Sequence, residues 1–382
     1  MLACSLDSTK YNISIYEKNG ALGRKFLVAG KGGFNLTHSE AHTQFAKRYY
    51  PKQFIELFLN HFSNIEFREW LKSIGIETYV GTSKRVFPTK GIKPIEVLNA
   101  IDKRLKTNNV SVFYNHEWTG WENNQLVFSQ KTTNININSD ITVFALGGAS
   151  WSVTGSDGSW TRFFKEKGIE INPFYPSNCA YHINWSKEMI KLVSGEALKN
   201  CEFTCDSVSK KGEAVLTDFG IEGSGIYGLS HTIRQQLLQK KTAELFIDFK
   251  PDLSFEEIRI RLDNRGSLSV KDVLEKKINL SKTQIDLIKN QTTKEEYNDV
   301  KILLQKIKSY PVTIVDFAPI DEAISTVGGI SIDEVSQDLE LKKMPNNYCI
   351  GEMLDWDAPT GGYLLQACFS MGSYLAGVLN KQ

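Results

Sequence analysis

The sequence lacks the features that mark several classes of protein. No apolar run among its 382 residues approaches the roughly 20 needed to cross a membrane. The first residues lack the basic-then-apolar order of a signal peptide. The net charge of +1 gives no reason to expect nucleic acid or an anionic membrane as a partner. These absences predict a soluble cytoplasmic protein, and they leave its oligomeric state open.

Cysteine is sparse, with six residues scattered along the chain, as expected for reduced thiols in the cytoplasm. Cys201 and Cys205 are four residues apart, but no second ligand pair with zinc-type spacing accompanies them. Structural zinc sites need about four such ligands. We therefore predict no metal site.

A third absence concerns the beginning of the chain. Residues 11–16 predict a short strand, which is followed by Glu17. In a dinucleotide-binding βαβ unit, an acid at this place binds the ribose hydroxyls. Such a unit opens with a strand and a G-x-G-x-x-G turn about 20 residues earlier, and no such turn precedes Glu17. A solvated acid at a strand end is the simpler alternative.

The organisation of the chain is that of an interrupted α/β domain. Strands, glycine turns and helical spacing alternate up to residue 175, and this style returns at about 318. Residues 51–74 have helical apolar spacing, and residues 77–89 predict a hairpin. We predict one discontinuous domain, formed by residues 1–175 and 318–382.

The intervening residues 176–317 predict an inserted domain. Its first part offers several β-type runs, and residues 254–308 have helical spacing. Capping-box pairs, in which each side chain satisfies the other residue's free backbone donor, start at Ser254, Ser281 and Thr293. The insertion is therefore β-rich and then helical.

The most specific motif lies near the end of the chain, where "GEMLDWDAPTGGYLLQACFSMG" begins at Gly351. Gly361 and Gly362 precede a helix that is apolar nearly all round. A helix N-terminus carries free N–H groups and partial positive charge, which suits a phosphate or an electron-rich ring edge. Asp355 could accept hydrogen bonds from ligand hydroxyls. The alternative is a glycine turn that caps a core helix, with Asp355 as an ordinary cap.

Two further glycine segments are weaker signals. "GRKFLVAGKGGFNLTH" begins at Gly23, and its Arg24 and Lys25 could meet phosphates. "FALGGASW" begins at Phe144 and ends a strand in two glycines, which permits close backbone approach. Each could also be a plain turn with solvated charges. His38 is the most attractive acid–base candidate, against the alternative of a loop or capping histidine.

Taken together, these segments resemble a known family. The stretches "GRKFLVAGKGGFNLTHSE", "FALGGASW", "TDFGIEGSGIYGLS" and "GEMLDWDAPTGGYLLQACFSMGSYLAG" closely resemble bacterial NAD(P)/FAD-dependent oxidoreductases. These include an aminoacetone-oxidase-like FAD-binding family and are related to the flavoprotein of bile-acid dehydroxylation. The resemblance covers residues ~11 to ~379. It implies a glutathione-reductase-type, Rossmann-like FAD domain with an inserted β-barrel-like and helical domain that serves the substrate.

The resemblance also implies roles for individual residues. Glu17 would bind the adenosine ribose of FAD, and Asp355 would lie near its ribityl and pyrophosphate part. The helix that opens at Gly361, Gly362 and Tyr363 would point at the flavin, where its dipole stabilises charge on the reduced ring. Tyr363 is also a weak catalytic candidate. The remaining residues expected around FAD are Gly23, Arg24, Lys25, Gly32, Gly33 and Asn35 in the loop, and Ala145, Leu146 and Gly147 near the adenine half.

The family opens with a strand and a glycine turn that this sequence does not contain. We expect residues 1–10 to match only the tail of the family's first helix, either because the chain is a fragment, which we favour, or because the protein has changed role. Losing two charge-assisted hydrogen bonds and a helix dipole costs roughly 4–8 kcal/mol. We therefore expect this chain to bind FAD weakly and an extended chain to bind it tightly.

The predicted function is an FAD-dependent oxidoreductase that acts on an unidentified small molecule. NAD(P)H as electron donor follows from the family resemblance alone, because no second dinucleotide fingerprint is present. Two alternatives stay open. One is a truncated or non-catalytic binding module with a flavoprotein fold. The other is a flavin-dependent RNA-modifying enzyme, against which the near-neutral charge argues.

Overall fold

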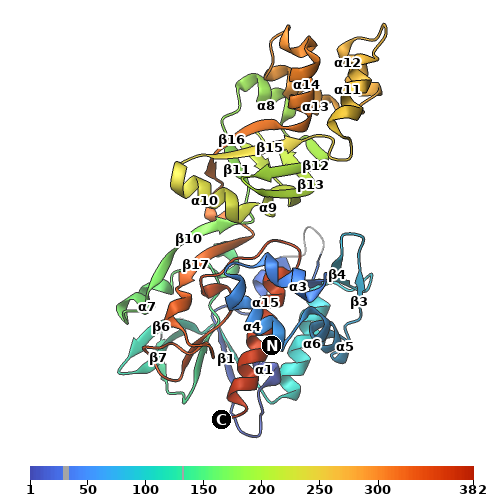
Figure 1. Cartoon of the computed structure of the whole chain (residues 1–382). Helices are drawn as coiled ribbons and strands as arrows, with labels where there is room; N and C mark the ends of the chain where they lie inside the picture. Colours follow the sequence, from blue (N-terminus) through green and yellow to red (C-terminus); the bar gives the residue numbers. More distant parts are fainter. Residues whose placement is uncertain (29–33, 131–132) are drawn as a thin grey trace. The chain divides into compact units, whose positions relative to one another are not determined.

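The structure is a computed structural model that describes residues 1–28, 34–130 and 133–382 (Figure 1). The chain divides into two compact units. The first comprises Met1–Tyr175 and Ile324–Gln382, and the second comprises Pro176–Ala323. Each unit has its own buried apolar core, so each is described by itself.

The first unit contains two parallel strand pairs. Strand β1 (Ser14–Glu17) pairs with β5 (Ser111–Tyr114), and β9 (Thr142–Phe144) pairs with β18 (Asn347–Cys349). Parallel pairing requires crossover connections, here partly helical, as in Rossmann-like domains. Within the described residues these pairs form two separate sheets.

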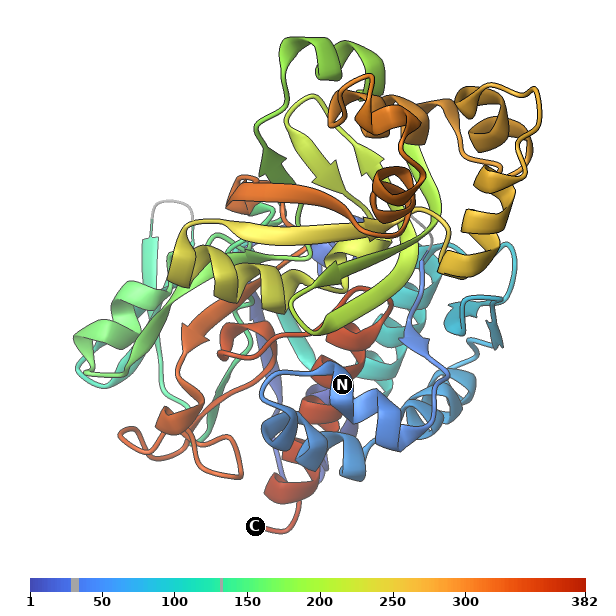
Figure 2. The ribbon, with the colours of Figure 1, turned by 45° about the horizontal axis from the view of Figure 1, so that its top comes forward.

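Helix α15 (Tyr363–Leu379) is the central helix of this unit. Figures 1 and 2 both show it beside the short helix α1 (Leu2–Ser5) and α4 (Lys52–His61). Its apolar sequence is explained by this position, because it is packed on several sides. The helical character expected over 51–74 is confirmed, and it is divided between two helices. Helix α4 ends at His61, and α5 (Asn64–Ser73) starts anew at a Ser63–Glu66 capping box.

The segment expected to be a glycine loop also holds structure. It contains α2 (Arg24–Val28) and the two-residue strand β2 (Thr37–His38). Strand β2 pairs with β4 (Arg85–Pro88), which forms the expected hairpin with β3 (Thr78–Val80). The other elements of the first unit are α3 (His42–Phe45), α6 (Pro94–Thr107), β6 (Glu117–Glu122), β7 (Gln125–Gln130), β8 (Thr133–Ile137), α7 (Thr161–Glu166), most of β10 (Ile171–Ser177) and β17 (Ser325–Ile330).

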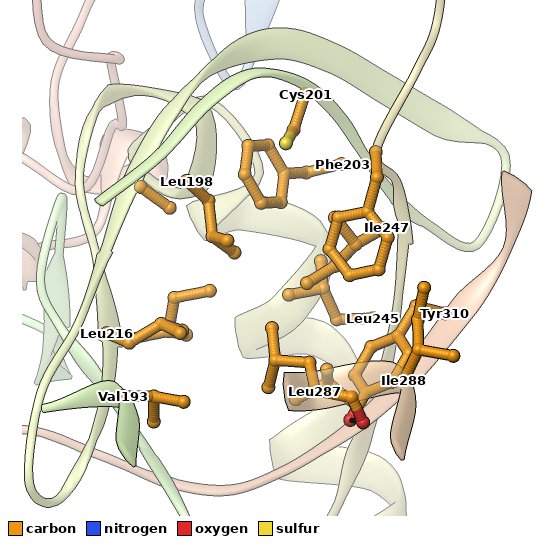
Figure 3. Close-up of a cluster of buried hydrophobic side chains, with 14 of the residues drawn as sticks. Val193, Leu198, Cys201, Phe203, Leu216, Leu245, Ile247, Leu287, Ile288 and Tyr310 are labelled. Atoms are coloured by element: carbon orange, nitrogen blue, oxygen red, sulfur yellow. Dashed lines mark hydrogen bonds between the residues drawn. The ribbon is translucent and has the colours of Figure 1, made fainter. Parts of the chain in front are cut away.

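The second unit is built on a closed six-stranded barrel in the order β11-β14-β13-β12-β15-β16. Its interior is filled by side chains from the strands and from two helices, which point toward one another in Figure 3. A barrel this small has room for its own side chains only. Its strands are β11 (Tyr181–Ile183), β12 (Ala197–Cys205), β13 (Val208–Leu216), β14 (Gly220–Glu222), β15 (Ala243–Asp248) and β16 (Tyr310–Phe317).

The helices of the second unit follow the expected start signals. The capping boxes at Ser254 and Ser281 are both present. Thr293 and Glu296 also bond reciprocally, but only one 3₁₀ turn follows them. The helices are α8 (Lys187–Val193), α9 (Ser224–Tyr227), α10 (Ser230–Lys240), α11 (Phe255–Asp263), α12 (Val270–Lys276), α13 (Lys282–Asn290) and α14 (Val300–Lys308). The expected α/β class with a barrel and helical part is confirmed.

A buried ion pair joins two elements of this unit. Lys308 at the end of α14 lies 2.6 Å from Asp248 at the end of β15, and their side chains are only 9% and 15% exposed. Lys308 also donates to the carbonyls of Lys250 and Leu253. Every donor of the ammonium group is thus used, so the pair is well satisfied in spite of its burial.

Across the described parts of the chain, none of the helices combines the length and the apolar character that crossing a membrane requires.

Candidate functional site

Lys25 brings together three turns of the first unit. It lies in α2, just after β1, and its Nζ is 3.1 Å from Glu352 Oε2 and 3.2 Å from Ser150 Oγ. Ser150 follows strand β9, and Glu352 follows β18. Turns at the carboxyl ends of parallel strands are where Rossmann-like domains bind their ligands. The geometry therefore points to this place as the candidate site.

Glu352 is a candidate that the sequence did not single out. Its side chain is 9% exposed, against 28% for Lys25. Its Oε1 accepts a hydrogen bond from the Thr326 amide at 3.2 Å. A buried carboxylate held by a cation and an amide is fixed in place, and its remaining acceptor capacity suits ligand hydroxyls. The available signal was an acid directly after Gly351, at the end of a strand.

Asp355, which the resemblance placed on the cofactor, is engaged by the protein. Its Oδ2 accepts from Asn172 Nδ2 at 2.7 Å, and its Oδ1 accepts from the Gly328 amide at 2.9 Å. These bonds tie β10 and β17 to the turn after β18. A cofactor role for Asp355 has no support in this geometry and stays a prediction.

The turn after β9 is packed against protein. The Gly147 carbonyl accepts from Trp160 Nε1 at 3.1 Å, and the Gly148 carbonyl accepts from Ser156 Oγ at 2.8 Å. Gly147 has φ +76°, and a Cβ there would lie 2.8 Å from the Ser156 hydroxyl. A Cβ at Gly148 would collide with the Thr326 hydroxyl. The glycines are thus explained by packing, while Ala145, just before them, is exposed.

The predicted residues near β1 form a local cluster. Glu17 Oε1 accepts from both the amide and the side chain of Asn19 at 2.8 Å. Arg24 Nη1 donates to Asn19 Oδ1 at 2.8 Å. Asn19 therefore links the expected ribose acid to the expected phosphate ligand, and it was not predicted.

The positions of the other loop residues that were expected around FAD do not test that role. Gly23 has φ +69°, and a Cβ there would press on Leu98. Asn35 is half-buried just before β2. Gly32 and Gly33 lie outside the described residues, so their predicted roles stay predictions.

Helix α15 opens at two glycines in left-handed conformation, Gly361 with φ +109° and Gly362 with φ +94°. A Cβ on Gly362 would lie 2.6 Å from Thr37 Cα, so the helix start is pressed against the backbone of β2. The N-cap residue is Gly362 itself, which offers no side-chain cap. The positive end of a 17-residue helix is thereby left to backbone groups, which suits an electron-rich ligand.

The structure separates the two catalytic candidates. The His38 ring stacks on the ring of Tyr363, with centroids 5.2 Å apart. Its Nδ1 accepts from the Glu40 amide at 3.2 Å, and the main chain of Ser83 also bonds the ring. Burial lowers the pKa of His38. Both ring nitrogens of His38 are thus used within the protein, and its catalytic role stays a prediction. The Tyr363 hydroxyl donates to a carboxylate, Glu40, at 2.7 Å.

The described residues contain no group of three or more His, Cys, Asp and Glu side chains arranged to hold a metal ion. Cys201 and Cys205 are buried free thiols in β12.

Comparison with known proteins decides the family. The model of the HI0933-like protein Rossmann domain matches residues 1–378. The chain belongs to this family. The expected resemblance, the Rossmann-like fold class and the enzyme class, an FAD-dependent oxidoreductase, are confirmed.

A curated relative and two solved structures are similar over most of the chain. The 3-dehydro-bile acid delta(4,6)-reductase of Clostridium scindens is 24% identical over 391 aligned residues, covering 96% of this chain and 91% of the relative. The 3-ketosteroid-delta4-(5alpha)-dehydrogenase of Rhodococcus jostii is 12% identical, with 100% and 94% coverage and a TM-score of 0.47. A quinol-fumarate reductase is 11% identical, with 99% and 68% coverage and a TM-score of 0.47. Structural likeness at this level carries no argument about function.

Proposed function

We propose that this family member binds FAD in its first unit, at the turns joined by Lys25, and reduces a carbon–carbon double bond conjugated to a carbonyl in a steroid-like substrate. NAD(P)H is proposed as the electron donor. The substrate class is supported by the reductase of Clostridium scindens, which matches along 91% of its own length. The observation that carries the cofactor site is the Lys25–Glu352–Ser150 contact at the ends of three strands.

The residues present fit FAD by their chemistry. Lys25 and the uncapped start of α15 favour the anionic parts of a ligand, and Glu352 can accept from hydroxyls. Bound FAD supplies the hydride transfer. In this proposal Glu352 takes the hydroxyl-binding role that the sequence gave to Asp355, and Glu17 keeps the ribose.

The second unit is proposed as the substrate domain. Because its barrel is filled by its own side chains, we place no ligand inside it (Figure 3). Its contribution to the substrate would come from residues outside that core.

The cofactor is tested by titrating the purified chain with FAD and following the flavin spectrum and protein-bound fluorescence. We expect saturable binding that Glu352→Gln weakens about tenfold or more, since one charge-assisted hydrogen bond contributes about 1.5–3 kcal/mol. Lys103→Met is the control, because Lys103 is exposed on α6 of the same unit. Absence of saturable binding, or equal affinity of all three proteins, would overturn the assignment.

The donor and substrate are tested separately on the FAD-loaded protein. Anaerobic addition of NADH or NADPH should bleach the flavin bands, and a conjugated steroid ketone should restore them while losing its own ultraviolet absorbance. Bleaching without reoxidation by such ketones would overturn the substrate class and leave the cofactor assignment standing.

A further inference from the structure

A polar network surrounds Tyr363, the first residue of α15. Its hydroxyl donates to Glu40 Oε1 at 2.7 Å. Arg48 holds the same carboxylate with two parallel bonds, Nε to Oε1 and Nη2 to Oε2, both 2.8 Å. A two-bond guanidinium fork fixes the plane of a carboxylate. Glu40 therefore presents one orientation to the Tyr363 hydroxyl.

The tyrosine is also held from its other sides. The Tyr49 hydroxyl donates to the Tyr363 carbonyl at 2.8 Å, and the His38 ring stacks on the Tyr363 ring. Asn64 Nδ2 donates to the carbonyls of His38 and Glu40 at 2.7 and 3.2 Å, which fixes the segment that carries them. The side chain of Tyr363 thus has one preorganised position beside the glycines that open α15.

The network combines a nearly buried carboxylate with a partly exposed cation. The Glu40 side chain is 11% exposed and that of Arg48 is 37% exposed, so water partly screens their mutual attraction. What the pair specifically supplies is a carboxylate and a cation next to one buried phenol.

We propose that Glu40 and Arg48 are positioning residues for Tyr363, and that the Tyr363 hydroxyl gives the proton that completes the reduction. This proposal rests on the proposed function. Tyr363 would protonate the carbon next to the carbonyl, and bound reduced FAD would supply the hydride that the far carbon of the double bond gains. The substrate would thereby gain two electrons and two hydrogens, with the reduced cofactor as the source of the electrons. The phenolate, stabilised by Arg48, then regains a proton from water.

The groups around Tyr363 have opposite effects on its pKa. Burial raises the pKa of Tyr363, Glu40 raises it further, and Arg48 lowers it. The other titratable or charged groups that face this place are His38, Tyr49 and, at the Gly361 turn, Arg85. Removing the Glu40 charge should therefore lower the pKa of Tyr363, because Arg48 then acts unopposed.

The first test needs no cofactor. The chain is labelled with [¹³Cζ]tyrosine, and Tyr363→Phe identifies one of the 14 tyrosine signals. We expect the Tyr363 signal to titrate at lower pH in Glu40→Gln than in the wild type. Glu334→Gln is the matched control, because Glu334 is another carboxylate of the same unit, 10% exposed and paired with a lysine at 2.7 Å. An unchanged midpoint in Glu40→Gln, or an equal shift in the control, would overturn the positioning role.

The second test uses the FAD-loaded protein and a conjugated steroid ketone. We expect Tyr363→Phe to lower kcat by about 10²-fold or more, as for loss of a positioned acid, and Glu40→Gln to lower kcat with little change in KM. Both variants should retain FAD within a few-fold of the wild type. If Tyr363→Phe keeps the wild-type kcat, Tyr363 is not the proton donor, and the proposal that the protein binds FAD is unaffected. Failure of the wild type to bind FAD would instead overturn the proposed function, and the tyrosine titration would still decide the positioning.

Discussion

The close contact between Gly362 at the start of α15 and the backbone of Thr37 predicts that Gly362→Ala destabilises the first unit. An alanine Cβ would lie 2.6 Å from Thr37 Cα and 2.8 Å from its carbonyl carbon and amide nitrogen. These are backbone atoms of a paired strand, so they cannot turn away as a flexible side chain would. The helix start must therefore move away from β2, or the strand must shift.

Two costs combine at this position. A non-glycine residue at φ +94° costs about 1–3 kcal/mol in backbone strain. Forcing an extra carbon into a packed contact costs about 1–3 kcal/mol more. We expect Gly362→Ala to lower the free energy of unfolding of the first unit by about 2–6 kcal/mol in total.

Gly91→Ala separates the two costs. Gly91 lies in the same unit with a nearly identical φ of +96°, but a Cβ there would meet nothing within 4 Å. It should therefore show the strain alone. The assay is urea unfolding of both variants, comparing the transition that belongs to the first unit, since the two units need not unfold together. Equal losses in both variants would refute the claim that α15 is pressed against β2.

Three other outcomes follow from single contacts. Lys308→Met should destabilise the second unit by about 3–5 kcal/mol, because it leaves the carboxylate of Asp248 buried without its cation; thermal unfolding that is unchanged would contradict this. Burial raises the pKa of Glu334, but bonds from a lysine and an amide outweigh it and lower that pKa. The stability that these bonds contribute is complete above the unfolded-state pKa of Glu334. It is lost as pH falls through the folded-state pKa, so Glu334→Gln should flatten the acid limb of the curve of stability against pH. Asp355→Asn should mainly lower the free energy of unfolding, whereas Glu352→Gln should mainly lower the affinity for FAD. Urea unfolding and flavin titration of both variants measure the two effects.

Local patterns predicted those elements whose own residues determine them. The apolar run of α15 and the hairpin β3–β4 are present where the sequence placed them. The helical character of residues 51–74 was predicted, but the break at Ser63 was not, because apolar spacing continues across it. The capping box from Ser63 to Glu66 was present in the sequence and marks the new helix start.

Elements that depend on distant partners were not predicted. Strand β2 has two residues, and it exists because Thr37 and His38 pair with β4 about 50 residues later. A count of glycines in residues 18–40 indicated only a loop. The network at Tyr363 was missed for the same reason, because Glu40 and Arg48 meet Tyr363 across more than 300 positions.

The two acids after β18 show what residue type alone leaves undecided. Glu352 and Asp355 stand three positions apart in one glycine-rich motif, and either could accept from a ligand hydroxyl. The chain decides between them by supplying partners from elsewhere. Asp355 accepts from neutral donors, Asn172 and the Gly328 amide, whereas Glu352 accepts from Lys25, which also contacts Ser150 after β9. The cation is what separates the two acids, so our proposed site is built on the acid beside Lys25.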